Sequence, residues 1–153
     1  MKLVNVIFGI SFVLYLLAMI ILLFLGQRGY IWVDVTLLDY IKKSSNFVPF
    51  KTISTYIQAI IGSSMNMDIP IKNLVGNLFM FLPIGIYLPF FINRINKIST
   101  FNIFMIILLF FIEAIQLVTR RGSFDIDDFI LNMLGALIGF RIWNTNIVQK
   151  LLK

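Results

Sequence analysis

The distribution of apolar and polar positions divides the chain into four long apolar segments with short polar connections. Residues 3–25 carry no charged side chain, and residues 71–92, 100–119 and 128–147 carry few. About 20 apolar residues in a helix cross the hydrocarbon core of a bilayer, because each helical residue adds about 1.5 Å. The pattern predicts four transmembrane helices, packed as one membrane domain over residues 1–153.

The segment between the first two apolar stretches, residues 30–70, mixes charged and apolar positions. Its apolar residues recur at helical spacing and are Phe50, Ile53, Ile57, Ile60 and Ile61. This spacing predicts an amphipathic helix in the membrane interface or over the mouth of the bundle. Pro49 fits its first turn, with Asn46 or Ser45 near the cap. A surface helix without a functional role explains the same pattern equally well.

Composition narrows the class of protein and the chemistry open to it. Hydrophobic residues make up 59 % of the 153 positions, which is typical of an all-α integral membrane protein. The net charge of +6 is spread along the chain without a basic patch interleaved with aromatic residues, so no nucleic-acid partner is predicted. The chain has no Cys and no His, which excludes disulfides, thiolate chemistry and a histidine base. Carboxylates, amides, hydroxyls, Lys and Arg remain.

The distribution of charge predicts how the chain crosses the membrane. Four spans place both termini on one side, and that side receives the bases Lys2, Arg94, Lys97, Lys150 and Lys153 and no acid. The other side receives every aspartate. Because cytoplasmic loops carry an excess of Lys and Arg, both termini are predicted to be cytoplasmic, and the amphipathic helix extracytoplasmic.

Polar residues inside the apolar segments are the candidates for function. A charged side chain at bilayer depth costs at least about 2.5–3.5 kcal/mol, so Glu113 needs a physical reason. Three of the apolar segments carry such polar groups near their predicted outward ends, and these groups satisfy one another only by facing inward. We therefore expect a pocket open to the outside. The predicted ligand-binding residues are Asn73, Asn77, Glu113, Gln116, Arg121, Asp125, Asp128 and Asn132.

Several of these residues also fit structural roles. Asp125 is favoured as the N-cap of the fourth span, with Asp128 at the N3 position. The spacing of the aspartates matches no calcium loop, so no metal site and no cofactor are predicted. Asn73 and Asn77, four residues apart, can also act as hydrogen-bonding contacts between helices. An ion pair with Arg120 or Arg121 is the structural alternative for Glu113, which with Gln116 and Arg120 forms one polar stripe.

Two further features concern helix packing. Pro83 lies inside the second apolar segment and predicts a kink or break there, because proline removes a helical hydrogen bond. Gly135 and Gly139 form a small-xxx-small ridge on the fourth segment, which predicts close contact with another helix.

The order and spacing of these motifs, over roughly residues 45–140, resemble the VanZ-like family. The residues that carry the resemblance are Asn73, Gly76, Asn77, Phe81, Pro83 and Gly85, then Glu113 and Gln116, then Arg121, Asp125, Asp127, Asp128, Asn132 and Gly135. The segment Asn46, Phe47, Pro49, Phe50, Thr52 and Ile53 is also similar to the stretch after that family's first span. The resemblance implies a small protein of the bacterial cell membrane. Some members confer low-level resistance to teicoplanin and related lipoglycopeptides.

The resemblance supplies no reaction, so three hypotheses remain open. In the first, the outward pocket binds a lipid-anchored ligand with a polar head, such as a membrane lipid, a lipoglycopeptide or a lipid-linked cell-wall precursor. In the second, the protein is an enzyme that acts on such a lipid, with Glu113 as general base and Arg121 holding a phosphate. In the third, it is a structural partner in a cell-envelope complex, and the polar residues only pack.

Overall fold

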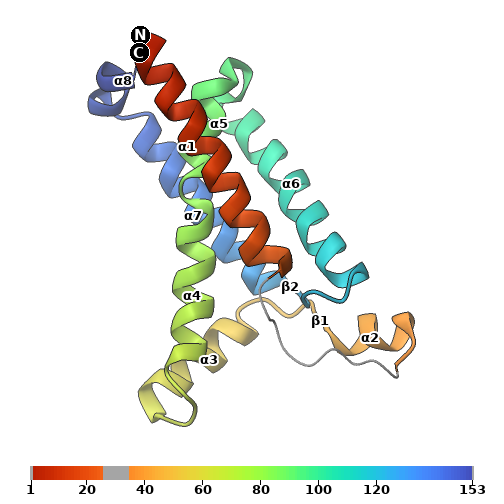
Figure 1. The fold of residues 1–153 in the computed structure, drawn as a ribbon. Coiled ribbons are helices and arrows are strands. Elements are labelled where there is room, and N and C mark those ends of the chain that lie inside the picture. The colour runs from red at the N-terminus through yellow and green to blue at the C-terminus, as the bar shows by residue number, and fades with distance from the viewer. Residues whose placement is uncertain (1, 26–34, 153) are drawn as a thin grey trace.

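The structure is a computed structural model that describes residues 2–25 and 35–152. Its long elements are α1 (Lys2–Ile20), which continues as the π-helical turn η1 (Ile21–Leu25), then α4 (Asp68–Phe81), α5 (Ile84–Phe91), α6 (Ile98–Val118) and α7 (Ile126–Trp143). Helices α1, α6 and α7 run side by side with the pair α4–α5, in which α5 continues from α4 along the bundle (Figure 1). The short elements are α2 (Leu37–Lys43), β1 (Ser45–Asn46), α3 (Lys51–Gly62), η2 (Asn93–Asn96), β2 (Phe124–Asp125) and α8 (Asn146–Leu152).

Three helical stretches among the described residues are long and apolar enough to cross a membrane. They are Leu3–Leu25, Asp68–Phe91 and Ile98–Val118. Their boundaries lie within three residues of the predicted segments 3–25, 71–92 and 100–119. The protein is therefore an all-α membrane protein, whose described residues include one short strand pair.

The helix predicted as the fourth span is α7, and it differs from the other three. It ends at Trp143, and a turn separates it from α8, so it stops short of the predicted boundary at residue 147. Three charged residues, Asp127, Asp128 and Arg141, lie within α7, which is why composition alone does not mark it as a span.

The second span is divided at Pro83, as the sequence predicted. Helix α4 ends at Phe81 and α5 begins at Ile84, with Pro83 at the N-cap position of α5. A proline break leaves carbonyl groups without helical partners, which is costly in lipid. Tyr15 on α1 compensates for one of them, because its hydroxyl donates a hydrogen bond of 2.8 Å to the carbonyl oxygen of Met80.

Helix α7 packs very closely against both halves of this divided span. A Cβ atom on Gly135 would overlap the carbonyl oxygen of Leu78, and one on Gly139 would overlap that of Leu82. In the opposite direction, a Cβ atom on Gly85 would overlap the carbonyl oxygen of Ala136. The predicted glycine ridge is confirmed as the place where two backbones meet.

Helix α1 covers the bundle mainly through aromatic rings. The ring of Phe12 lies 5.0 Å from that of Tyr87, and the ring of Phe8 lies 4.7 Å from that of Phe90 (centroid distances). Beneath them, buried apolar side chains of α5, α6 and α7 form one continuous core with Met19 and Leu23. The other face of α1 is exposed and apolar, as expected of a helix that faces lipid.

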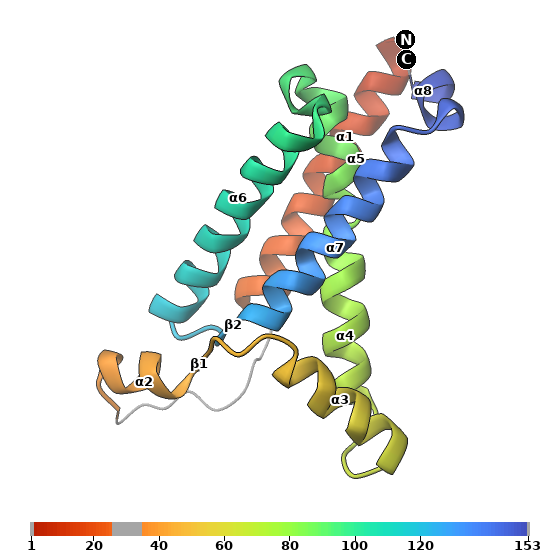
Figure 2. The same cartoon turned by 180° about the vertical axis from the view of Figure 1, so that it is seen from behind.

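The segment α2–β1–α3 lies across the end of the bundle where α4 begins and α6 ends, and the two chain ends lie at the opposite end (Figures 1 and 2). Strand β1 pairs in parallel with β2, with Asn46 opposite Asp125. Two local predictions were wrong. Pro49 precedes α3 instead of lying in its first turn, and Asn46 and Ser45 belong to β1 instead of capping α3.

The close contact at the glycine ridge predicts a large difference between equivalent substitutions. Gly135→Ala and Gly139→Ala place a methyl group on a backbone carbonyl, so we expect each to destabilise the protein by about 1–3 kcal/mol or more. Gly76→Ala is the matched control, because a Cβ atom there meets nothing within 4 Å and alanine favours helix. Thermal unfolding in detergent measures the difference, and equal midpoints for the three variants would contradict the packing.

Candidate functional site

Among the acids that the structure describes, Asp127 is the most deeply buried, with 0 % of its surface exposed. Its Oδ1 accepts a hydrogen bond from the backbone N–H of Phe50 at 2.5 Å, and its Oδ2 accepts from the N–H groups of Thr52 at 2.7 Å and Ile53 at 3.1 Å. The first N–H groups of a helix have no intrahelical partner, and a negative charge there is favourable. Asp127 therefore caps α3 from another helix, which explains why Asn46 and Ser45 are not needed as caps.

Asp125 joins three elements. It is the N-cap of α7, where its Oδ1 accepts from the backbone N–H of Asp127 at 2.9 Å, so the predicted capping role is confirmed. Its Oδ2 accepts from the Thr52 hydroxyl at 2.6 Å, and Asn46 Nδ2 donates to Oδ1 at 3.2 Å. One buried carboxylate thus connects α7 to both β1 and α3.

Asp128 connects α7 to the second span. Asn77 Nδ2 donates to Asp128 Oδ1 at 2.5 Å, and Asn77 is buried. Tyr56 on α3 is half-buried near the same acids: burial raises the pKa of its phenol, and the charges of Asp128 and Asp125 raise it further. The Tyr56 hydroxyl is therefore protonated at neutral pH and can act as a hydrogen-bond donor.

Glu113 and Gln116 lie together on the buried face of α6, with 3 % and 2 % of their side chains exposed. Gln116 Nε2 donates to the carbonyl oxygen of Leu23 at 2.8 Å, which ties α6 to the end of the first span. The predicted polar stripe ends at Gln116, because α6 stops at Val118 and Arg120 adopts a left-handed conformation with φ 56°. Arg120 therefore lies outside the helix.

The two arginines after α6 have different surroundings. Arg120 is half-buried, with its guanidinium 5.8 Å from the ring centroid of Tyr40, and its Nη2 donates to the carbonyl oxygen of Val35 at 2.9 Å. Arg121 has an exposed side chain, and its backbone N–H donates to the carbonyl oxygen of Gln116 at 2.8 Å. Arg120 thus fastens α2 to the end of α6, whereas the Arg121 side chain is accessible.

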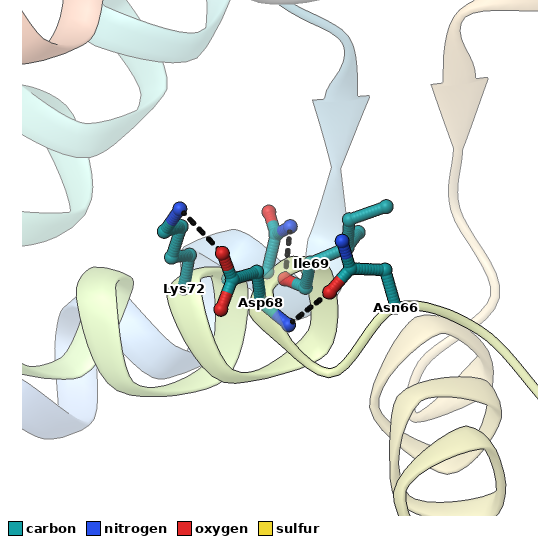
Figure 3. Close-up of polar contacts among 5 residues, drawn as sticks. Asn66, Asp68, Ile69 and Lys72 are labelled. Atoms are coloured by element: carbon teal, nitrogen blue, oxygen red, sulfur yellow. Dashed lines mark hydrogen bonds and ion pairs between the residues drawn. The ribbon is translucent and has the colours of Figure 1, made fainter. Parts of the chain in front are cut away.

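The remaining two predicted residues, Asn73 and Asn132, have different partners. Asn73 is half-buried and donates to the carbonyl oxygen of Ile69 in its own helix at 2.9 Å. Next to it, Lys72 and Asp68 form an exposed ion pair of 3.2 Å (Figure 3). Asn132 is 2 % exposed, and its Oδ1 has no hydrogen-bond partner among the residues that the structure describes. A buried amide oxygen of this kind is a ready acceptor.

These contacts define one polar cluster at the α3 end of the bundle, which we call the α3–α7 polar cluster: Asn46, Thr52, Tyr56, Asn77, Asp125, Asp127 and Asp128. The sequence analysis assigned only Asn77, Asp125 and Asp128 of these to ligand binding. The role of Asp127 was not predicted, because the backbone N–H groups that it binds lie 74 to 77 residues away in the chain. Asp125, Asp127 and Asp128 accept from different donor groups, and no group of three acids suited to a metal ion occurs in the described part of the chain.

The capping by Asp127 leads to a prediction for the start of α3. Asp127→Asn places an NH₂ group against one of the backbone N–H donors and removes the charge, so we expect a loss of about 1–3 kcal/mol. Amide hydrogen exchange at Thr52 and Ile53 should accelerate while the centre of α6 is unchanged. Asp68→Asn is the control, because its ion pair is exposed. Unchanged exchange at Thr52 in Asp127→Asn would contradict the cap.

Comparison with known proteins places this architecture in a family. A family described as VanZ/LLP1 matches residues 12–149. Protein VanZ of Enterococcus faecium is 25 % identical over 119 residues, which cover 76 % of this chain and 64 % of that relative. The chain thus spans less than two thirds of the relative's length. No solved structure matches the chain. The family match includes every element from the middle of α1 to α8, and it confirms the resemblance noted in the motifs: the chain belongs to the VanZ/LLP1 family.

Proposed function

We propose that this protein acts in low-level resistance to teicoplanin-like lipoglycopeptides by binding a lipid-anchored ligand with a polar head at the α3–α7 polar cluster. Membership of the VanZ/LLP1 family supports the link to resistance. The observation that carries the binding site is the gathering of carboxylate, amide and phenol groups at one end of an otherwise apolar bundle.

The chemistry of the cluster suits a head group rich in hydroxyl and amine donors. Asp125 and Asp128 supply negatively charged acceptors, which form stronger hydrogen bonds than neutral ones. Val75 and Phe79 are exposed apolar side chains on α4, the helix that carries Asn77, and they offer a surface for an acyl chain. The exposed Arg121 side chain, the half-buried Asn73 and the buried groups Glu113, Gln116 and Asn132 complete the proposed site.

We further propose that α7 crosses the membrane as a fourth span and that both termini are cytoplasmic. The chain begins and ends at the same end of the bundle, which requires an even number of crossings (Figure 1). Bases including Arg94, Lys97 and Lys150 lie in or beside the connections at that end, and the aspartates lie toward the other. The described connections at that end carry bases and no acid, whereas the other end carries both, and this difference supports the orientation.

The absence of Cys from the sequence makes the orientation directly measurable. Ser64→Cys, between α3 and α4, should react with a membrane-impermeant maleimide in intact cells. Asn146→Cys, at the start of α8, should react only after the membrane is permeabilised. Both positions are exposed in the structure, so protein burial does not explain a difference. The reverse pattern, or labelling of both in intact cells, would rule out this topology.

Substitution of single acidic side chains tests the binding site. Glu113→Gln and Asp128→Asn should each weaken binding of a radiolabelled lipoglycopeptide by about two- to tenfold, because a hydrogen bond contributes about 0.5–1.5 kcal/mol. Arg121→Ala should weaken it by a similar factor if the head group carries an acid. The same variants should lower resistance in cells that contain equal amounts of the protein.

Two controls separate a lost contact from a lost fold. Arg141→Gln removes an exposed charge at the other end of α7, and it should leave binding and resistance unchanged. Tyr56→Phe keeps the aromatic ring and removes only the hydroxyl, so weaker binding with unchanged thermal stability would identify a ligand contact. Wild-type binding and resistance in Glu113→Gln, Asp128→Asn and Arg121→Ala would refute the proposal.

Two other results would favour the alternative functions. Time-dependent conversion of a lipid by the purified protein would favour an enzyme. Co-purification of a fixed partner would favour a structural role.

A further inference from the structure

The loop between β1 and α3 exposes four consecutive apolar residues. Phe47 is 68 % exposed and Phe50 is 61 % exposed, and Val48 and Pro49 between them are also exposed. Runs of three or four exposed apolar residues are unfavourable in water unless they have a function. This loop therefore needs an apolar environment that the protein itself does not provide.

The loop is held in place by specific contacts. Asn46 Oδ1 accepts a hydrogen bond from the backbone N–H of Val48 at 3.3 Å, and the N–H of Phe50 donates to Asp127. The ring of Phe47 lies 5.1 Å from the ring of Phe124, measured between centroids. Both ends of the loop are thus held by contacts with the rest of the fold. Its two phenylalanine rings are therefore exposed because the loop is held in this conformation.

The backbone at Phe50 strengthens this argument. Its φ of 63° lies in the left-handed region, which bulky side chains rarely adopt and which glycine adopts without strain. Such strain persists only where the surrounding structure maintains it, and it is concentrated at functional positions. A strained and exposed phenylalanine indicates that its ring is required on the outside.

The position of the loop identifies the apolar environment. The exposed apolar surface of α6 continues to Val118, and only six residues later Phe124 contacts Phe47. In both views the segment α2–β1–α3 lies across the end of the membrane-crossing helices (Figures 1 and 2). Lys51 follows Phe50 directly, and Lys42 lies on α2; both side chains are exposed. Aromatic rings beside lysines are typical of segments at the membrane interface.

We propose that residues 47–50 insert into the boundary between head groups and acyl chains of the leaflet at the α3 end, where Lys51 and Lys42 contact the phosphates of anionic phospholipids. Phe47 and Phe50 supply the inserted rings, and the lysines supply charge complementarity to the lipid. The partner is thus a lipid surface, and this contact does not depend on ligand binding at the α3–α7 polar cluster.

A spin label at one engineered cysteine tests the insertion in the full-length protein. Val48→Cys places the label between the two phenylalanines and leaves both intact. In nanodiscs of phosphatidylcholine with phosphatidylglycerol, we expect collisions with oxygen, which partitions into lipid, to exceed those with a water-soluble nickel reagent. Ser64→Cys is the control, because Ser64 is exposed in a polar turn, and its label should show the opposite order.

Two substitutions in the Val48→Cys background complete the test. Phe50→Gly relieves the left-handed strain, so it should leave thermal stability in detergent unchanged or higher while the label moves toward water. Lys51→Gln, or nanodiscs of phosphatidylcholine alone, should also make the label shallower. A label at residue 48 that meets the nickel reagent as readily as the label at residue 64 would overturn the insertion. Equal depth in both lipid mixtures and in Lys51→Gln would overturn the contact with anionic lipid.

Discussion

The end of the bundle that carries the polar residues depends on one buried carboxylate. Asp127 accepts three backbone N–H groups from the start of α3 and is itself fully buried in α7. In a low-dielectric setting, a buried carboxylate without hydrogen bonds is unfavourable, and so are unpaired N–H groups at the start of a helix. Here the carboxylate and the N–H groups satisfy each other. Because α3 begins where Asp127 holds it, the Thr52 hydroxyl reaches Asp125.

The features that the sequence predicted correctly are those set by local chemistry. Pro83 divides the second span, Asp125 caps the helix that follows it, and three apolar segments match the length of a bilayer core. The glycine ridge on α7 predicted a close contact, although its partner, the broken second span, became known only from the structure.

The features that the sequence did not predict join residues far apart in the chain. Asp127 lies 77 residues from Phe50 along the chain, and no local pattern connects an aspartate in one helix to the backbone of another. Arg120 was assigned to a helical stripe, but α6 ends at Val118, and helix periodicity does not reveal the left-handed conformation that Arg120 adopts two residues later. Thr52 and Tyr56 lie in the α3–α7 polar cluster because Asp127, which is distant in the sequence, orients α3.

The division of the second span at Pro83 has a mechanical consequence. Helices α4 and α5 are two short helices instead of one long helix, and both pack against the backbone of α7 at Gly135 and Gly139 or next to them. Carbonyl groups set against glycines leave no side chains between the two backbones that could repack, so this junction is stiff. Because Asn77 is hydrogen-bonded to Asp128 and its neighbour Leu78 lies against Gly135, a shift of this part of α4 would carry α7 with it.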